Sequence, residues 1–159
     1  CTGTSWTAKL VGLTSLLKAN VGWTLTRSCR FNLGDEDCLV DLGPLTITGA
    51  VSAITEQRRL FTTNLSYVDD YFVGGELLWT SGANTGLRSE IKAYSQAGGI
   101  LELQLRTEFD IVAADDFEVV PGCDKTRTTC IVKFDNVLRF GGFPDIPGND
   151  KLYLTPDVK

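Results

Sequence analysis

Residues 117–134, FEVVPGCDKTRTTCIVKF, decide the fold predicted for this chain. Residues 117–120 are aromatic and β-branched and alternate with a period of two, as half-buried strands do. Residues 131–134 have the same character. The sequence therefore predicts two antiparallel strands joined by a polar loop. Cys123 and Cys130 stand at the two ends of that loop, so we expect their sulfurs to lie close together.

A second pair of cysteines, Cys29 and Cys38, encloses another polar loop, with a glycine and an acidic turn inside it. Folding can bring the two loops together and so gather four sulfurs. Four thiolates can hold a Zn²⁺ ion or a [4Fe–4S] cluster, and paired cysteines can also form disulfides. The spacings of eight and six residues within the pairs are wider than those typical of zinc sites. The residues alone leave a metal centre, two disulfides and plain buried thiols open.

Three segments of the chain resemble a single protein family. They are CRFNLGDEDCLVDL (29–42), GELLWTSGANTGLRSEIK (75–92) and the residues from PGCDK to FGGFPDIPGND (121–150). The family is that of the tail-tip or baseplate hub proteins of long-tailed phages and gene transfer agents, to which the lambda tail-tip protein L is similar. The resemblance implies a structural protein of the virion, located at the tail tip or baseplate, and not an enzyme.

The resemblance also implies a cofactor and partners. Its matching positions for a [4Fe–4S] cluster are Cys29, Cys38, Cys123 and Cys130, with zinc or no metal as the alternatives. The cluster would serve as a structural staple in a component that links the tail tube to the central fibre. The implied partners are other hub subunits in a homo-oligomer, the distal tail protein, and the central tail fibre or host-recognition protein. Two other classes stay open, a small soluble iron–sulfur redox carrier and a disulfide-stapled binding module.

Composition narrows the function further. The chain has 159 residues, enough for one domain with a core, and a net charge of −5, which argues against direct binding of nucleic acid. It contains no histidine, which removes Ser-His-Asp and Cys-His nucleophile arrangements. No apolar run reaches the roughly 20 residues of a membrane span. The fifth cysteine, Cys1, lies outside both loops, and the paired aspartates at 69–70 and 115–116 are predicted to be solvated turn residues.

The pattern of short strands and turns predicts a mainly β fold, a small barrel or sandwich-like domain with one or two short helices and an extended C-terminal arm. Gly49 is expected at a bulge, and the loop 81–86 is expected to use its glycines and asparagine at positive φ. The predicted domains are an N-terminal segment, 1–43, continuing from a missing N-terminal part, a β-rich domain, 44–143, and a proline-containing arm, 144–159. Of about ten strands, those outside 117–134 are at 5–11, 23–26, 45–55, 60–64, 76–80, 87–94 and 100–105, with helical segments at 13–20 and 65–72.

Overall fold

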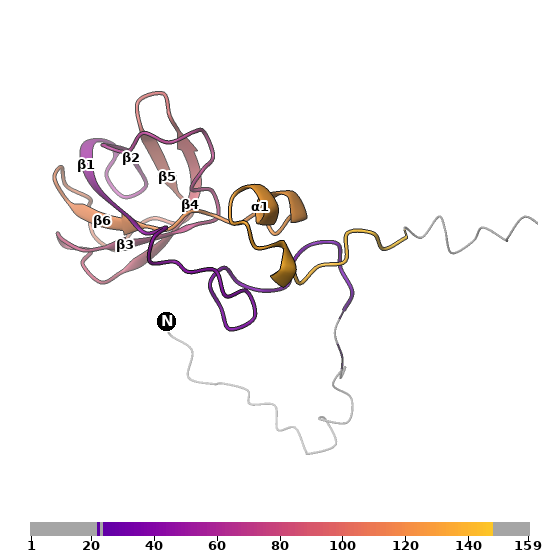
Figure 1. The fold of residues 1–159 in the computed structure, drawn as a ribbon. Helices are drawn as coiled ribbons and strands as arrows, with labels where there is room; N and C mark the ends of the chain where they lie inside the picture. The colour runs from indigo at the N-terminus through magenta and orange to yellow at the C-terminus, as the bar shows by residue number, and fades with distance from the viewer. Residues whose placement is uncertain (1–21, 23, 148–159) are drawn as a thin grey trace, which may run out of the picture.

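A closed antiparallel barrel forms the centre of the protein (Figure 1). The computed structural model describes residue 22 and residues 24–147. Around the barrel the strand order is β1-β2-β5-β4-β3-β6. A helix, α1 (Arg127–Val132), and a 3-10 turn, η2 (Val137–Arg139), follow it. The mainly β barrel predicted from the sequence is thereby confirmed. The strands are β1 (Ile47–Glu56), β2 (Leu60–Thr63), β3 (Glu76–Trp79), β4 (Arg88–Ser95), β5 (Ile100–Leu103) and β6 (Asp116–Val119).

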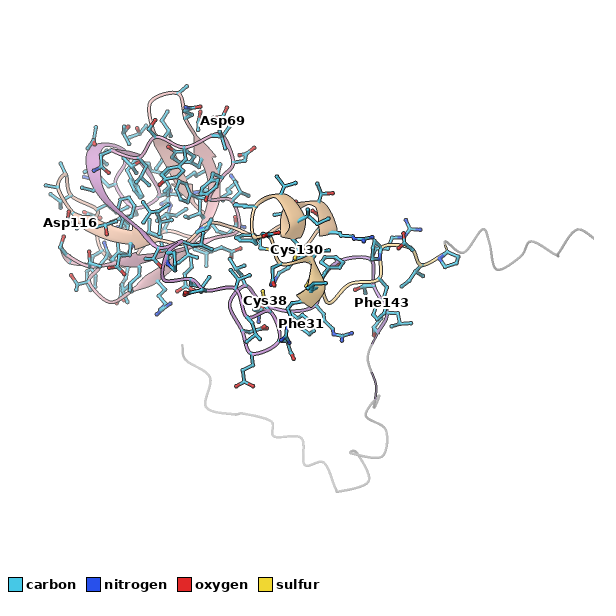
Figure 2. All side chains as sticks on the ribbon, in the orientation of Figure 1. Phe31, Cys38, Asp69, Asp116, Cys130 and Phe143 are labelled. Atoms are coloured by element: carbon cyan, nitrogen blue, oxygen red, sulfur yellow. The ribbon has the colours of Figure 1, made fainter. Side chains whose placement is uncertain are left out.

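Apolar side chains fill the interior of the barrel (Figure 2). Alternate residues of each strand point inward, so that in β6 Phe117 and Val119 are buried while Asp116 is exposed. The rings of Phe61, Trp79 and Phe117 pack against one another with centroids 5.6 to 6.0 Å apart. Every buried hydrophobic side chain among the described residues lies between Val51 and Val119. The hydrophobic core therefore belongs to the barrel alone.

The long strand β1 bends so that it can pair on both sides. Its first half pairs with β6 and its second half with β2. The register shifts between Val51 and Ala53 and again between Ile54 and Glu56. The predicted bulge at Gly49 is wrong, because Gly49 pairs regularly with Phe117. Glycine is needed there for another reason, since a Cβ would come within 2.7 Å of the Phe117 ring.

Most of the predicted strands are present. The ones expected at 45–55, 60–64, 76–80, 87–94, 100–105 and 117–120 are confirmed to within two residues at each end. Residues 65–68 are irregular and residues 69–72 form hydrogen-bonded turns in place of the expected helical segment, and residues 24–26 are not in a strand. The expected strand at 5–11 and helix at 13–20 lie outside the described residues. Six strands are found in the described part of the chain, fewer than the ten expected.

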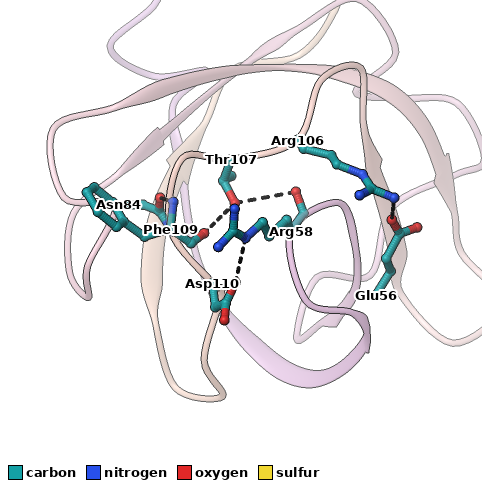
Figure 3. A network of polar contacts seen from close by, with 7 residues as sticks. All are labelled: Glu56, Arg58, Asn84, Arg106, Thr107, Phe109 and Asp110. Atoms are coloured by element: carbon teal, nitrogen blue, oxygen red, sulfur yellow. Dashed lines mark hydrogen bonds and ion pairs between the residues drawn. The ribbon is translucent and has the colours of Figure 1, made fainter.

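A polar network fastens the loop before β6 to one end of the barrel (Figure 3). Asn84 is fully buried, donates to the Phe109 carbonyl at 3.1 Å and accepts from the Phe109 amide at 3.0 Å. Ion pairs join Arg58 to Asp110 at 2.5 Å and Arg106 to Glu56 at 2.7 Å. Among the residues of the 81–86 turn, Gly82 and Gly86 have positive φ as expected, whereas Asn84 does not. Asn84 stabilises the fold through the hydrogen bonds of its side-chain amide.

A second, smaller unit stands beside the barrel (Figure 1). Residues 24–46 and 120–147, far apart in sequence, lie side by side and form what we call the cysteine lobe. The join is tight at Gly75 and Gly122, where a Cβ on Gly122 would overlap the Val73 carbonyl. Of the predicted arm, only 144–147 is described; there the Ile146 carbonyl accepts from the Arg27 guanidinium at 3.0 Å. The division into domains at 43/44 and 143/144 stays a prediction.

Candidate metal centre

Four cysteines line one small enclosed cavity in the cysteine lobe. Cys29 and Cys38 come from the first segment of the lobe, and Cys123 and Cys130 from the second. Figure 2 labels one member of each pair, Cys38 and Cys130, where the two segments meet. All four are free thiols and half-buried. The rest of the lining is mostly apolar and includes Phe31, Leu33, Val40, Phe134 and Phe140.

Local hydrogen bonds fix the first pair of cysteines. The Cys29 amide donates to the Lys125 carbonyl at 2.8 Å, which ties it to the second segment. The Lys125 ammonium in return donates to the Phe31 carbonyl. Asp35 shapes the turn before Cys38 by accepting from the Cys38 amide at 2.7 Å. This bond is the main reason why the pKa of Asp35 is lowered, so the carboxylate holds the loop at neutral pH.

The second pair does not lie across a strand hairpin, so the strand predicted at 131–134 is wrong. Helix α1 carries Cys130 instead. Thr126 caps the helix by accepting from the Thr129 amide, and Asp124 accepts from the Thr126 amide at 2.9 Å. The β-branched residues of α1 have no sheet face to pack on, and strand propensity depends on such packing. Local capping therefore decides the structure.

Two hydrogen-bond donors that the sequence analysis did not identify lie close to cysteine sulfurs. The Gly141 amide donates to the Cys29 Sγ at 3.3 Å, and the Asn136 side-chain amide lies 3.7 Å from the Cys38 Sγ. The same Asn136 amide donates to the Cys38 carbonyl at 2.6 Å, and the Asn136 carbonyl accepts from the Cys130 thiol at 3.2 Å. Asn136 thus bridges one cysteine of each pair. Asn136 lies within the segment 121–150 that carries the family resemblance, and no local pattern in that segment marks it.

The thiols lie near enough to influence one another electrostatically. Burial raises the pKa of Cys130, and charge on Cys29, Cys123 and Cys38 raises it further. Such crowding makes four bare thiolates unfavourable and a bound cation favourable. Among the described residues, however, no set of three or more Cys, Asp or Glu side chains converges on a point where a single metal ion would sit. The sulfurs surround the cavity.

A lysine connects this site to the barrel. Lys133 Nζ donates to the Tyr71 carbonyl at 2.5 Å and to the Gly122 carbonyl at 2.7 Å, and it lies 4.3 Å from the centre of the Tyr71 ring. Burial lowers the pKa of Lys133, while the nearby Cys123 and Asp124 act in the opposite direction. Lys133 therefore places a cation beside the cysteines and fastens α1 to the barrel.

The other candidate sites are structural. Asp69 accepts from the Gln96 amide at 2.7 Å, and Asp115 accepts from the Val112 amide at 2.8 Å, so each carboxylate holds a turn. The prediction of solvated turn residues is confirmed for Asp69 and Asp70 and is wrong for the second pair, because Asp115 is buried and Asp116 begins β6. Within the described ranges no helix has the length and hydropathy needed to cross a membrane.

Comparison with known families decides the affiliation of the chain. Residues 70–150, half of its length, match the family described as phage conserved hypothetical protein BR0599. The chain belongs to this family. Residues 1–41 of this BR0599-family chain match a second family, described as the N-terminal attachment domain of a baseplate hub protein. No curated protein matches the chain.

A solved structure extends the likeness to almost all of this BR0599-family chain. It is titled "Virion of native gene transfer agent (GTA) particle", and its similar chain is 33% identical with a TM-score of 0.75. The match covers 91% of this chain and 52% of the virion chain, so the chain spans about half the length of that relative. The chain is therefore a phage-type structural protein related to baseplate hubs, with a location at the tail or baseplate of a virion. The predicted resemblance is confirmed to this extent, and its iron–sulfur part stays a prediction.

Proposed function

We propose that the protein is a component of the baseplate hub that links the tail tube to the central fibre, and that its role is structural and not catalytic. Its partners in this proposal are other hub subunits, the distal tail protein and the central fibre or host-recognition protein. The family match, the hub attachment match and the likeness to a virion chain support it. The fold also suits a structural part, because the hydrogen bonds and the four-cysteine cavity of the lobe join two segments that are far apart in the sequence.

We further propose that Cys29, Cys38, Cys123 and Cys130 hold a [4Fe–4S] cluster. The observation that carries this proposal is that all four line one cavity although two come from each end of the described chain. The donor set fits the group: four sulfurs, amide donors from Gly141 and Asn136, and little other polar lining. A cluster bound there would supply iron–thiolate cross-links between the two segments of the lobe.

The wide spacing within each cysteine pair favours a cluster over a zinc ion. A single tetrahedral zinc ion with bonds of about 2.3 Å needs its four sulfurs within about 3.8 Å of one another. The described residues contain no set converging in this way, and the cavity between the sulfurs has a volume of only about 10 Å³, so the lobe would have to open around either group. A cross-link would also add stability to the lobe, because neither α1 nor η2 contains a buried residue. Apolar burial alone contributes little to its stability.

Anaerobic purification followed by iron, sulfide and zinc analysis tests the centre. We expect about four iron and four sulfide per chain and a broad absorbance band near 400 nm, as iron–thiolate chemistry gives. Replacing Cys130 by serine should abolish the band, whereas the matched variant Cys1→Ser should keep it. Zinc alone, or two disulfides with no metal, would refute the cluster.

The linking role needs a separate test. Particles assembled with a chain that carries Cys130→Ser should lack the central fibre or lose it on dilution, and particles with Cys1→Ser should keep it. Electron microscopy of purified tails gives the readout. If tails that lack this protein altogether still carry a tube joined to a fibre, the linking role is wrong whatever the metal content.

A further inference from the structure

A groove between the barrel and the cysteine lobe leads to one of the four cysteines. It has a volume of about 360 Å³ and runs along the lobe residues Asn32 and Lys125 and the barrel residue Arg88. Cys123 is the one cysteine of the four that lines it. The groove is as large as the smaller pockets that take small molecules in proteins. Solvent-borne molecules can therefore approach Cys123 from a side where the other three cysteines are absent.

Total exposure does not distinguish the cysteines, since all four are half-buried. The four cysteines differ in the space through which a molecule from solution can reach them. Cys29, Cys38 and Cys130 border the enclosed cavity and do not border the groove. Cys123 borders both spaces, and so does Leu33. These two side chains form the partition between the cavity and the groove.

We propose that Cys123 is the point of access to the four-cysteine site, the thiol that small thiol-reactive or thiol-bearing molecules in solution reach first. One consequence rests on the proposed function: a bound centre would be loaded and attacked from this side. The access of Cys123 itself is inferred only from the groove and from the position of Leu33 between the two spaces. It names no partner protein, because the groove suits a small molecule.

The charge of the groove defines the favoured class of molecule. Lys125 and Arg88 supply two positive charges to its lining, and Glu76 supplies one negative charge. Arg88 and Glu76 pair with each other, which leaves Lys125 as the unbalanced charge among these lining residues. Lys125 donates to the Phe31 carbonyl, and its charge also acts on the nearby Asp35 carboxylate. The charges in and around the groove are therefore largely balanced, and a small neutral thiol or alkylating agent suits it.

Alkylation kinetics of the reduced, metal-free full chain test the proposal. Each thiolate displaces iodide from iodoacetamide to form a carbon–sulfur bond, and mass spectrometry of peptides gives the rate at each position. We expect Cys123 to react at least about tenfold faster than Cys29, Cys38 and Cys130, because the enclosed thiols react only after local opening. Equal rates at all four cysteines, or a faster rate at any other of them, would overturn the proposal.

Three substitutions make the test specific to the route. Asn32→Trp places bulk in the groove and should slow labelling of Cys123 without slowing the other three. Leu138→Trp adds the same bulk at a residue that is 96% exposed and lines neither space, and it should change nothing. Leu33→Ala opens the partition and should raise the rates of the enclosed cysteines toward that of Cys123.

The outcome is independent of the metal analysis. A chain without iron in which Cys123 still reacts first would refute the cluster and keep the access route. A chain that holds a full cluster, but in which Cys123 is not the fastest thiol after metal removal, would support the cluster and refute the access route.

Discussion

Replacing Lys133 by methionine should loosen the cysteine lobe and leave the barrel intact. Lys133 gives two charged hydrogen bonds, to the carbonyls of Tyr71 and Gly122, and a cation–π contact with the Tyr71 ring. Methionine keeps most of the apolar stem and removes the ammonium, so the substitution isolates the polar contribution. The buried core of the barrel contains no residue of the lobe, and Tyr71, which Lys133 contacts, only packs against that core while partly buried.

The size of the effect follows from these contacts. Each hydrogen bond from a charged group contributes about 1.5 to 3 kcal/mol and the cation–π contact about 0.5 to 2 kcal/mol. Burial of the ammonium opposes them, as the lowered pKa of Lys133 indicates. A net loss of about 2 to 3 kcal/mol remains, which corresponds to a fall of about 30- to 150-fold in protection of lobe amides.

Native-state hydrogen exchange measures this loss region by region. In the Lys133→Met variant we expect faster exchange at the amides of Cys130 and Asn136 and unchanged exchange at Leu101 in β5. Lys92→Met is the matched control: Lys92 is an exposed lysine paired with Glu102, whose loss should cost less than about 1 kcal/mol. Equal loss of protection in barrel and lobe, or no loss in the lobe, would refute the idea that Lys133 couples the two.

Three further predictions concern the barrel and its join to the lobe. In urea unfolding, Asn84→Asp should destabilise the protein more than Asn84→Ala. A carboxylate at this position can still accept from the Phe109 amide, but it is a buried charge without a partner that faces the Phe109 carbonyl. The reverse order of stabilities would contradict this. Hydrogen bonds and charge from its basic neighbours lower the pKa of Glu102, so this group stabilises the fold above its unfolded pKa and stops doing so as the pH falls through its lowered folded value. Glu102→Gln should thus cost stability at pH 7 and nothing at pH 2, and a cost that does not change with pH would disprove the assignment. Gly122→Ala should reduce the melting temperature far more than Gly43→Ala, because a Cβ at Gly122 would overlap a backbone carbonyl while that at Gly43 meets a movable side-chain oxygen.

The barrel was predictable because its signals are local. Alternating apolar residues define β3, β5 and β6, and the glycines at 82 and 86 take the positive φ that a tight turn requires. Closure of the barrel was less visible, because it depends on pairing β1 with β6, far apart in the sequence, as in the pair Ile47 and Val119. The period of a strand does not specify its partner. A bulge at Gly49 was expected in β1, but the register of the strand shifts further along, where its partner changes from β6 to β2.

The candidate site, too, was predictable only where its signals are local in the sequence. The cysteine pairs were evident as residue types, and the structure places all four around one cavity. The strand expected at 131–134 failed because composition favoured β structure while the Thr126 cap set a helix. Asn136 and Lys133 were missed because their roles depend on contacts with residues about 100 and 60 positions away, Cys38 and Tyr71.

The cysteine lobe is the part of the molecule whose stability most needs an additional source. It has no sheet of its own, and none of the buried hydrophobic residues of the described chain lies in it. Hydrogen bonds such as those of Asn136 and Lys133 fix its geometry, but each contributes only about 1 to 3 kcal/mol after exchange with water. Half-buried rings around the cavity, those of Phe31, Phe134 and Phe140, add packing to these bonds. Four thiols around the same cavity offer a further source, since covalent or metal cross-linking through them would add to the folding free energy of the lobe. The barrel, whose buried core lies outside the lobe, should be affected less by loss of the centre.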